Sequence, residues 1–398
     1  MCHYAANERI VMKYLYVSTS AYPGNSAYAT RIEGICNALQ SDGNEITVLT
    51  DCSATGIEVQ YLNGFRILSS AKHKYQERTL SDKLLAYSRM LRRLKKLLNE
   101  EHFDCVITSS IYIRIRPVMG IIRKHNIPIV LESCEWFDTY NWKRGSKSLE
   151  YRMFIKAWNE DFVKADGVIA ISRMLENRYA EHNLPALRLP TIMDVKNTPY
   201  SLETSNEKIH LIFVGSISWG KDRVAEVIEA MQRLGNDQVE LHIYGPSMDA
   251  VRAQLADDTL LDKMQNTVFI HGSVPHGQIA LKCREADYGI LLRPDRRQSH
   301  AGFPTKLAEY MSAGTPVIAN NTGDVGLYMP RELLLDTQYT VEDVVKLLQY
   351  LLQLDPESRR KLRQQARNTA LQCFDYRSNT AGLNQFIRDV CEQYIHQH

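Results

Sequence analysis

The chain has 398 residues and a formal net charge of +2, with 44% hydrophobic and 24% charged residues. This balance is typical of a soluble globular protein and excludes a mainly disordered chain, a coiled coil, collagen and a small disulfide scaffold. The length predicts two or three domains, no apolar run reaches the roughly 18–20 residues of a membrane-spanning helix, and the near-neutral charge does not indicate nucleic-acid binding.

The first half of the chain alternates between strand-like and helical segments. Short β-branched runs that are almost continuously apolar predict parallel strands covered on both faces. We expect strands at 12–19, 45–51, 104–110, 128–133 and 167–172, and helices at 27–41, 81–101, 114–125, 148–164 and 173–182. Repeated β–α alternation is typical of a doubly wound α/β sheet.

The same alternation begins again after a polar segment, 191–208, which we interpret as a linker. Strands are expected at 209–217, 239–245, 267–274, 288–294, 316–321 and 332–336, helices at 222–234, 275–285 and 304–313, and mostly helix from 341 onward. Two Rossmann-like domains of similar size therefore fit better than one large sheet. Ligands of such sheets bind at the carboxyl ends of the strands, so we expect a site in a cleft between the domains.

The eight cysteines form no C-x-x-C pair and mostly lie in apolar runs, where a reduced thiol acts as a small hydrophobic group. Residues 1–12 lack the apolar core of a secretory signal. Both observations predict a cytoplasmic protein without a zinc site.

The segment 215–221, GSISWGK, follows a predicted strand and begins a predicted helix. Its G-x4-G-K spacing is that of a phosphate-binding P-loop, in which the next residue is a Ser or Thr that holds magnesium. Here the next residue is Asp222, whose carboxylate repels phosphate, so a true P-loop is disfavoured. Backbone N–H groups at a helix start and the ammonium of Lys221 still favour a diphosphate. The alternative is a plain glycine-rich turn with a solvated lysine.

A second motif, GFPTKLAEYMSAGTP, spans 302–316. Pro304 suits the first turn of a helix and Gly314 its end. Lys306 and Glu309 are three residues apart and therefore share one face of that helix. A glutamate near a helix start can accept both hydroxyls of a ribose. The alternative is a surface Lys–Glu pair that contributes little energy.

The segment 303–320, FPTKLAEYMSAGTPVIAN, strongly resembles the C-terminal signature of retaining glycosyltransferases of the GT-B fold, in the large family 4. Further segments resemble that family in the same order along the chain: 14–39, 165–172, 189–194, 213–221, 239–245 and 268–274. The resemblance implies two doubly wound domains facing across a cleft. It also implies an acceptor-side domain over 1–198, completed by a returning C-terminal helix at about 378–398, and a nucleotide-sugar domain over 205–377.

The chain departs from the family pattern at the hinge, where Thr191 and Ile192 replace an asparagine and a glycine, and at two positions of the donor site. The arginine that follows the donor-loop glycine is replaced by Ser216, and the first glutamate of the E-x7-E signature is replaced by Ala301. The sequence therefore resembles a divergent branch with the signature P-T-K-x-x-E-Y. Arg293 and Lys306 are the candidates to replace the missing arginine. Backbone N–H groups of residues 302 and 303 are the candidates to replace the missing glutamate.

The resemblance implies transfer of a sugar from a nucleotide diphosphate sugar to a hydroxyl acceptor with retention. The nucleotide sugar is a co-substrate, and no further cofactor is expected. Lys221 and Lys306 are the candidates to stabilise the leaving diphosphate in place of a metal ion, since the chain has no D-x-D motif. Glu135 is the candidate base, or else a carboxylate that caps the next turn. The remaining predicted binding residues are Gly24, Gly215, Ser216, Ser273, Val274, Arg293, Gly302, Phe303, Thr305 and Glu309.

Residues 89–98, RMLRRLKKLL, form an amphipathic basic helix. Such a helix can dock on an anionic membrane, here the inner face, or pack on the sheet with its basic side in solvent. The first interpretation suits a lipid-linked oligosaccharide acceptor and the second a soluble saccharide. Three alternative functions remain open: a nucleotide-sugar 2-epimerase of the same fold, a P-loop nucleotide-binding protein, and a sugar-binding module without activity.

Overall fold

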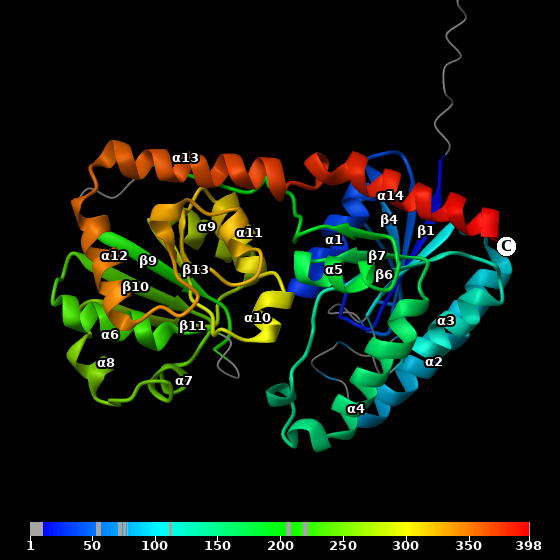
Figure 1. Ribbon diagram of the computed structural model, residues 1–398, viewed down its shortest axis with the longest axis horizontal. Coiled ribbons are helices and arrows are strands. Elements are labelled where there is room, and N and C mark those ends of the chain that lie inside the picture. Colours follow the sequence, from blue (N-terminus) through cyan, green and yellow to red (C-terminus); the bar gives the residue numbers. More distant parts are fainter. Residues whose placement is uncertain are drawn as a thin grey trace, which may run out of the picture.

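The computed structural model describes residues 11–52, 57–70, 74, 77, 79–110, 114–203, 208–217 and 222–397. The described chain forms two α/β domains that lie side by side, with a long helical segment along one edge of both (Figure 1). Each domain is built on a parallel sheet with helices on its two faces, so the expected pair of doubly wound Rossmann-like domains is confirmed.

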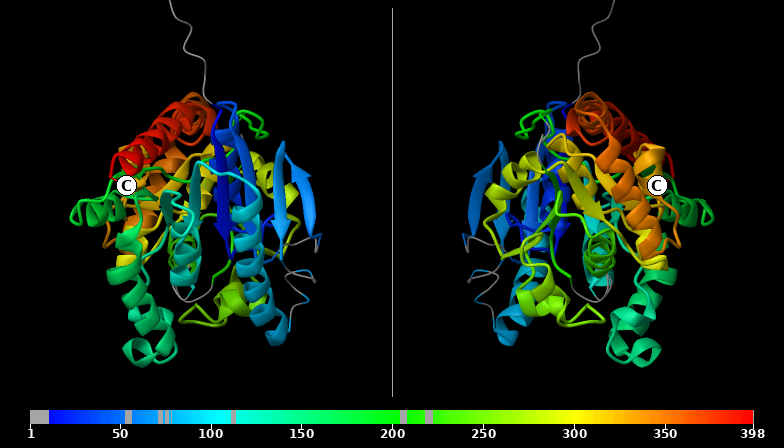
Figure 2. Two further views of the ribbon diagram at one scale, coloured as in Figure 1. Left: turned by 90° about the vertical axis from the view of Figure 1, so that its right-hand side faces the viewer. Right: turned by 90° about the vertical axis from the view of Figure 1, so that its left-hand side faces the viewer.

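The sheet of the first domain has the strand order β3-β4-β2-β1-β5-β6-β7-β8. Neighbouring strands are parallel except for the antiparallel pair β3–β4 at one edge, drawn in light blue in Figure 2. The strands are β1 (Lys13–Ser18), β2 (Glu45–Thr50), β3 (Val59–Leu62), β4 (Phe65–Ser69), β5 (Cys105–Ser109), β6 (Ile129–Ser133), β7 (Gly167–Ala170) and β8 (Ala186–Arg188).

Helices cover this sheet because their apolar faces match its buried strands. Their bounds are α1 (Ala27–Gln40), α2 (Leu80–Glu100), α3 (Ile115–Arg123), α4 (Leu149–Lys156) and α5 (Arg173–Ala180). Ser26 caps α1 by accepting the N–H of Ala29, and Thr79 forms a capping box with Asp82 at the start of α2. On α2, Met90 and Leu94 are fully buried, so this helix packs on the sheet.

The sheet of the second domain is entirely parallel, in the order β11-β10-β9-β12-β13-β14. Its strands are β9 (Ile209–Val214), β10 (Val239–Tyr244), β11 (Val268–Gly272), β12 (Tyr288–Leu291), β13 (Val317–Asn320) and β14 (Leu334–Leu335). The helices around it are α6 (Val224–Leu234), α7 (Met248–Arg252), α8 (Leu260–Lys263), α9 (His276–Glu285), α10 (Arg297–Ala301), α11 (Thr305–Ser312) and α12 (Val341–Gln353).

The last two helices connect the domains. Helix α13 (Pro356–Cys373) runs along the second domain, and α14 (Tyr376–Gln397) returns to the first, as expected. There α14 packs against α1, and a buried hydrogen bond of 2.7 Å runs from Asn44 Nδ2 to Asn384 Oδ1. In the part of the chain that the structure describes, no helix is both long and apolar enough to cross a bilayer.

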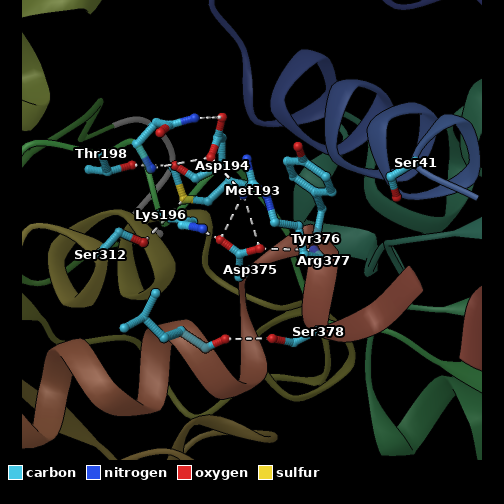
Figure 3. A network of polar contacts seen from close by, with 12 residues as sticks. Ser41, Met193, Asp194, Lys196, Thr198, Ser312, Asp375, Tyr376, Arg377 and Ser378 are labelled. Atoms are coloured by element: carbon cyan, nitrogen blue, oxygen red, sulfur yellow. Dashed lines mark hydrogen bonds and ion pairs between the residues drawn. The ribbon is translucent and has the colours of Figure 1, made fainter. Parts of the chain in front are cut away.

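The chain crosses between the domains twice, and the two crossings are tied together (Figure 3). The N–H of Met193 donates to the carbonyl of Phe374 at 2.8 Å, and the N–H of Tyr376 donates to the carbonyl of Met193 at 3.1 Å. The carboxylate of Asp375, which is only 3% exposed, accepts the N–H of Lys196 at 2.9 Å. A compact hinge therefore joins the two domains.

Candidate active site in the interdomain cleft

A cavity of about 380 Å³ opens between the two domains. Its walls come from segments that follow the carboxyl ends of five parallel strands, β1, β6, β7, β9 and β12, together with the loops before α1 and α11. This is the place where α/β sheets bind ligands. Of the residues predicted for the site, the cavity is lined by Glu135, Gly215, Ser216, Arg293, Gly302, Phe303, Thr305, Lys306 and Glu309.

Gly215 allows a lysine side chain to lie against the backbone at the end of β9. Its φ of +133° is a conformation that side-chain-bearing residues rarely adopt. A Cβ placed there would lie 2.5 Å from Cε and 2.7 Å from Nζ of Lys306. The glycine of the predicted donor loop and the lysine of the second motif are thus in direct contact, although 90 residues separate them.

Lys306 forms an ion pair with Asp222, with 2.9 Å between Nζ and Oδ2. Its Nζ also lies 4.1 Å from the centre of the Phe213 ring. Burial lowers the pKa of Lys306, and the Asp222 carboxylate opposes that shift. Asp222 was expected to repel phosphate, but its charge is balanced by this lysine, because the loop after β9 and the start of α11 meet at the cavity.

Arg293 adds a second cation to the same wall. The residue is 4% exposed, and its backbone is held to Asn320 by hydrogen bonds of 2.8 and 2.9 Å in both directions. Its Nη1 donates to the carbonyl of Ser299 at 3.3 Å. The charge of Arg293 also lowers the pKa of Lys306, so the two cations act on the same region.

Glu309 lies on α11, one turn beyond Lys306, and is half-buried. It lines the main cavity and also a second cavity of about 330 Å³ on the hinge side, bounded by α1, α9 and residues 193–199. A carboxylate that lines two cavities can contact a ligand bound in either of them.

One expectation for the donor site is wrong. The N–H of Gly302 was a candidate to contact the donor, but it donates to the carbonyl of Gln298 at 3.0 Å and closes the last turn of α10. Gly302 instead lies where the backbones of the two domains come close together. An added Cβ would lie 3.7 Å from the carbonyl oxygen of Cys134 in the first domain.

Other predicted residues are not brought to the cavity. Gly24, Ser273 and Val274 are not among the described residues that line it, although Asn25 and Ser26, which follow Gly24, do line it. Lys221 lies outside the described residues. Among those described, no group of three or more His, Cys, Asp or Glu side chains is arranged to hold a metal ion.

A buried ion pair beside the cavity was not predicted from the sequence. Arg31 of α1 donates from Nε to Oε1 of Glu132 at the end of β6, and both side chains are 2% exposed. Arg31 Nη1 also donates to the carbonyls of Leu189 and Pro190, at 3.0 and 2.9 Å. The signal was present, because Arg31 is the one basic residue in an otherwise largely apolar helix, and Glu132 is the one charge in a buried strand.

Residues 26–192 match the family described as "Glycosyl transferase 4-like domain", and residues 195–369 match "Glycosyl transferases group 1". No curated protein sequence matches the chain.

Several solved structures share the fold. Sucrose-phosphate synthase from Thermosynechococcus elongatus has 16% identity and a TM-score of 0.71, with 96% of this chain and 100% of that chain covered. HepE from Anabaena, in complex with UDP, has 15% identity and a TM-score of 0.65, with coverage of 96% and 100%. A glycosyltransferase from Rickettsia africae has 13% identity and a TM-score of 0.66, with coverage of 97% and 99%.

Proposed function

Since the chain is a glycosyltransferase of the GT-B type, we propose that it transfers a sugar from a nucleotide diphosphate sugar to a hydroxyl of a saccharide or lipid-linked oligosaccharide. We propose further that the transfer retains the anomeric configuration and needs no metal ion. The reaction would belong to polysaccharide or glycolipid synthesis. The observation that carries the proposal is the cation pair Lys306 and Arg293 beside Gly215 and Glu309 on the second-domain wall of the cleft.

This wall suits a nucleotide diphosphate. The two phosphates would lie between the backbone at Gly215 and the charged ends of Lys306 and Arg293, and the Glu309 carboxylate would accept the two ribose hydroxyls. The structure of HepE, which has the same fold, contains UDP and, in another form, UDP-glucose. That similarity supports a nucleotide-sugar donor here.

The chemistry follows from where charge develops. As the bond between the anomeric carbon and the diphosphate oxygen breaks, its electron pair goes to the diphosphate and positive charge builds on the sugar. Preorganised cations at the leaving oxygen lower the barrier, because they need no rearrangement at the moment of reaction. Lys306 and Arg293 would supply that charge, so the proposed mechanism does not require a divalent ion. Glu135 on the opposite wall would accept the proton of the attacking hydroxyl.

The acceptor side faces the first domain, and we propose that this domain contacts the inner face of the membrane from the cytoplasm. The apolar side of α2 is used in packing, since Leu97 and Leu98 are buried against the domain. Its residues Arg92, Lys95 and Lys96 are exposed. An exposed basic stripe on a packed helix can attract anionic lipid without inserting into it.

The decisive experiment is a binding and turnover screen against UDP-, GDP-, TDP- and ADP-sugars, with and without EDTA. We expect one nucleotide to raise the melting temperature, EDTA to have no effect, and NMR of the product to show the donor's anomeric configuration. Magnesium-dependent stabilisation by ATP alone would overturn the proposal in favour of a P-loop protein. Conversion of the donor to its 2-epimer would favour the epimerase.

A further inference from the structure

Helix α10 of the second domain docks on residues 134–142 of the first, directly beside the cavity. Arg297 Nη2 donates to the carbonyl of Phe137 at 2.9 Å, and the guanidinium lies 5.2 Å from the centre of the Trp136 ring. The next residue, Gln298, is 7% exposed and reaches the same loop. The two domains therefore meet here through specific side chains.

The side chain of Gln298 makes three hydrogen bonds, all to the first domain. Its Oε1 accepts from the Tyr140 hydroxyl at 2.8 Å and from Asn141 Nδ2 at 2.9 Å. Its Nε2 donates to Oε2 of Glu135 at 3.0 Å. Because Asn141 Nδ2 can only donate and the Glu135 carboxylate can only accept, reversing the amide would set N–H against N–H at Asn141 and oxygen against oxygen at Glu135. The orientation of Gln298 is thus fixed, and an N–H points at the carboxylate.

Glu135 follows β6 and lines the cavity. The chain of the second domain comes very close at this point, since a Cβ added to Gly302 would lie 3.9 Å from Glu135 Oε2. The other charged side chains that line the cavity are Arg31, Asp222, Arg293, Lys306 and Glu309. Gln298 is uncharged and belongs to the second domain, and it holds one oxygen of the Glu135 carboxylate in the first domain.

We propose that Gln298 is a positioning residue that aims the Glu135 carboxylate at the acceptor hydroxyl only when the two domains are closed. This inference rests on the proposed function, in which Glu135 is the base. An amide that holds one oxygen of a carboxylate also fixes the direction of the other oxygen. When the domains separate, Gln298 leaves with the second domain and the carboxylate is no longer held in that direction.

The hydrogen bond between Gln298 and Glu135 restricts proton transfer to the form in which the two domains are in contact. In that form the acceptor oxygen bonds to the anomeric carbon, its proton passes to the Glu135 carboxylate, and the diphosphate leaves with the electron pair of the broken bond. In the open form, a donor bound to the second domain meets no oriented base. The arrangement therefore links activation of the acceptor to closure over the donor.

The sharpest variant is Gln298→Glu. It keeps an oxygen facing Tyr140 and Asn141 but replaces the N–H that faces Glu135 with a second oxygen. Two carboxyl groups about 3 Å apart share a proton, which raises the pKa of the base. We expect the acidic limb of the kcat/KM profile to move to higher pH and kcat at pH 7 to fall at least tenfold. The affinity for the nucleoside diphosphate that the wild type binds should change less than twofold.

Two further variants separate positioning from docking. Gln298→Met removes all three hydrogen bonds and should lower kcat with little change in the donor KM. Arg297→Met removes contacts of the same helix with the same loop, away from Glu135, and should leave the pH profile unchanged. A wild-type pH profile in Gln298→Glu, or the same profile change in both methionine variants, overturns the inference.

A measurement without turnover keeps this test independent of the proposed function. At pH 8, Gln298→Glu should lower the melting temperature, because it faces Glu135 with a like charge. In a Glu135→Ala background the same substitution should cost less than half as much. Equal losses in the two backgrounds would show that the two side chains are not coupled. A wild type that neither binds nor turns over any nucleotide sugar would instead contradict the proposed function, with the coupling intact.

Discussion

Lys306 in the first turn of α11 and Asp222 just before α6 form an ion pair at the carboxyl ends of the second sheet, with 2.9 Å between Nζ and Oδ2 and side-chain exposures of 17% and 8%. The pair holds the ammonium group at the backbone of Gly215, where a phosphate is expected. It also gives Asp222 a structural role, because its carboxylate holds the lysine in place.

Replacing Lys306 should therefore weaken nucleotide binding. Lys306→Met removes a charged hydrogen-bond donor to the phosphates, and we expect a loss of about 1.5–3 kcal/mol in binding free energy, measured by calorimetry. The variant also leaves Asp222 buried without its partner, so the melting temperature should fall. Lys282→Met is a matched control, since that lysine pairs with Glu285 on α9. If Lys282→Met lowers the nucleotide affinity as much as Lys306→Met does, Lys306 makes no specific contact with the phosphates.

Nucleotide binding should also weaken at alkaline pH. Burial lowers the pKa of Lys306 from its ordinary value of 10.5, and Asp222 raises it. The ammonium binds phosphate only when it is protonated, so affinity is lost as pH rises through the lowered pKa. Asp222→Asn removes the opposing charge, and its loss of affinity should begin at lower pH. Dissociation constants measured between pH 7 and 10 test this, and identical curves for the two proteins would contradict it.

Glu309 should contribute to nucleoside recognition rather than to the diphosphate. We expect Glu309→Gln to weaken binding of a ribonucleoside diphosphate by about 1.5–3 kcal/mol, because a charged acceptor of the ribose hydroxyls is lost. The same substitution should have a much smaller effect on the 2′-deoxy nucleotide, which offers one hydroxyl fewer. If both nucleotides lose equal affinity, Glu309 does not contact the ribose.

Three histidines on the sheet of the second domain should make its stability sensitive to acid. His210, His242 and His271 lie side by side on β9, β10 and β11, with 3.1 Å between His242 Nδ1 and His271 Nε2. Burial and the two neighbouring imidazoles lower the pKa of His242 from 6.5, against the opposing charge of Glu240. Just below pH 6.5, His242 therefore binds a proton more readily in the unfolded chain than in the folded protein.

The sign follows from that difference. The free energy of unfolding is highest above pH of about 6.5 with respect to His242. It falls as the pH drops below that value, because the unfolded state then binds more protons than the folded state. We expect His242→Gln to reduce the drop in melting temperature between pH 7.5 and 5.5. The exposed His396 offers the control: His396→Gln should follow the wild type. A His242→Gln curve parallel to the wild type would refute the assignment.

The regular elements could be predicted because each carries its own periodic signal. The runs at 45–51 and 239–245 are β2 and β10, within one residue at each end. The hairpin β3–β4 was missed because its strands are short and β3 is partly exposed. A single helix was expected at 148–164. The α-helix ends at Lys156, and a π-helical turn, Ala157–Asp161, follows it directly, with Trp158 and Asp161 buried. A single helical period cannot anticipate such an insertion.

The site was predictable only in part, for a physical reason. Lys306 and Glu309 belong to one helix, so their shared face follows from spacing alone. The contact of Gln298 with Glu135 joins two domains, and no local pattern encodes it. The pairing of Lys306 with Asp222 likewise depends on how β9 and α11 meet, which only the folded chain determines.

The return of α14 has a consequence for biosynthesis. Ile387 and Val390 are buried in the same apolar cluster as Ile32 and Ile35 of α1. On the ribosome, the residues that complete the first domain emerge only after the entire second domain has been made. Until α14 has been made, the face of α1 that it covers in the folded protein stays exposed, while the second domain can already fold.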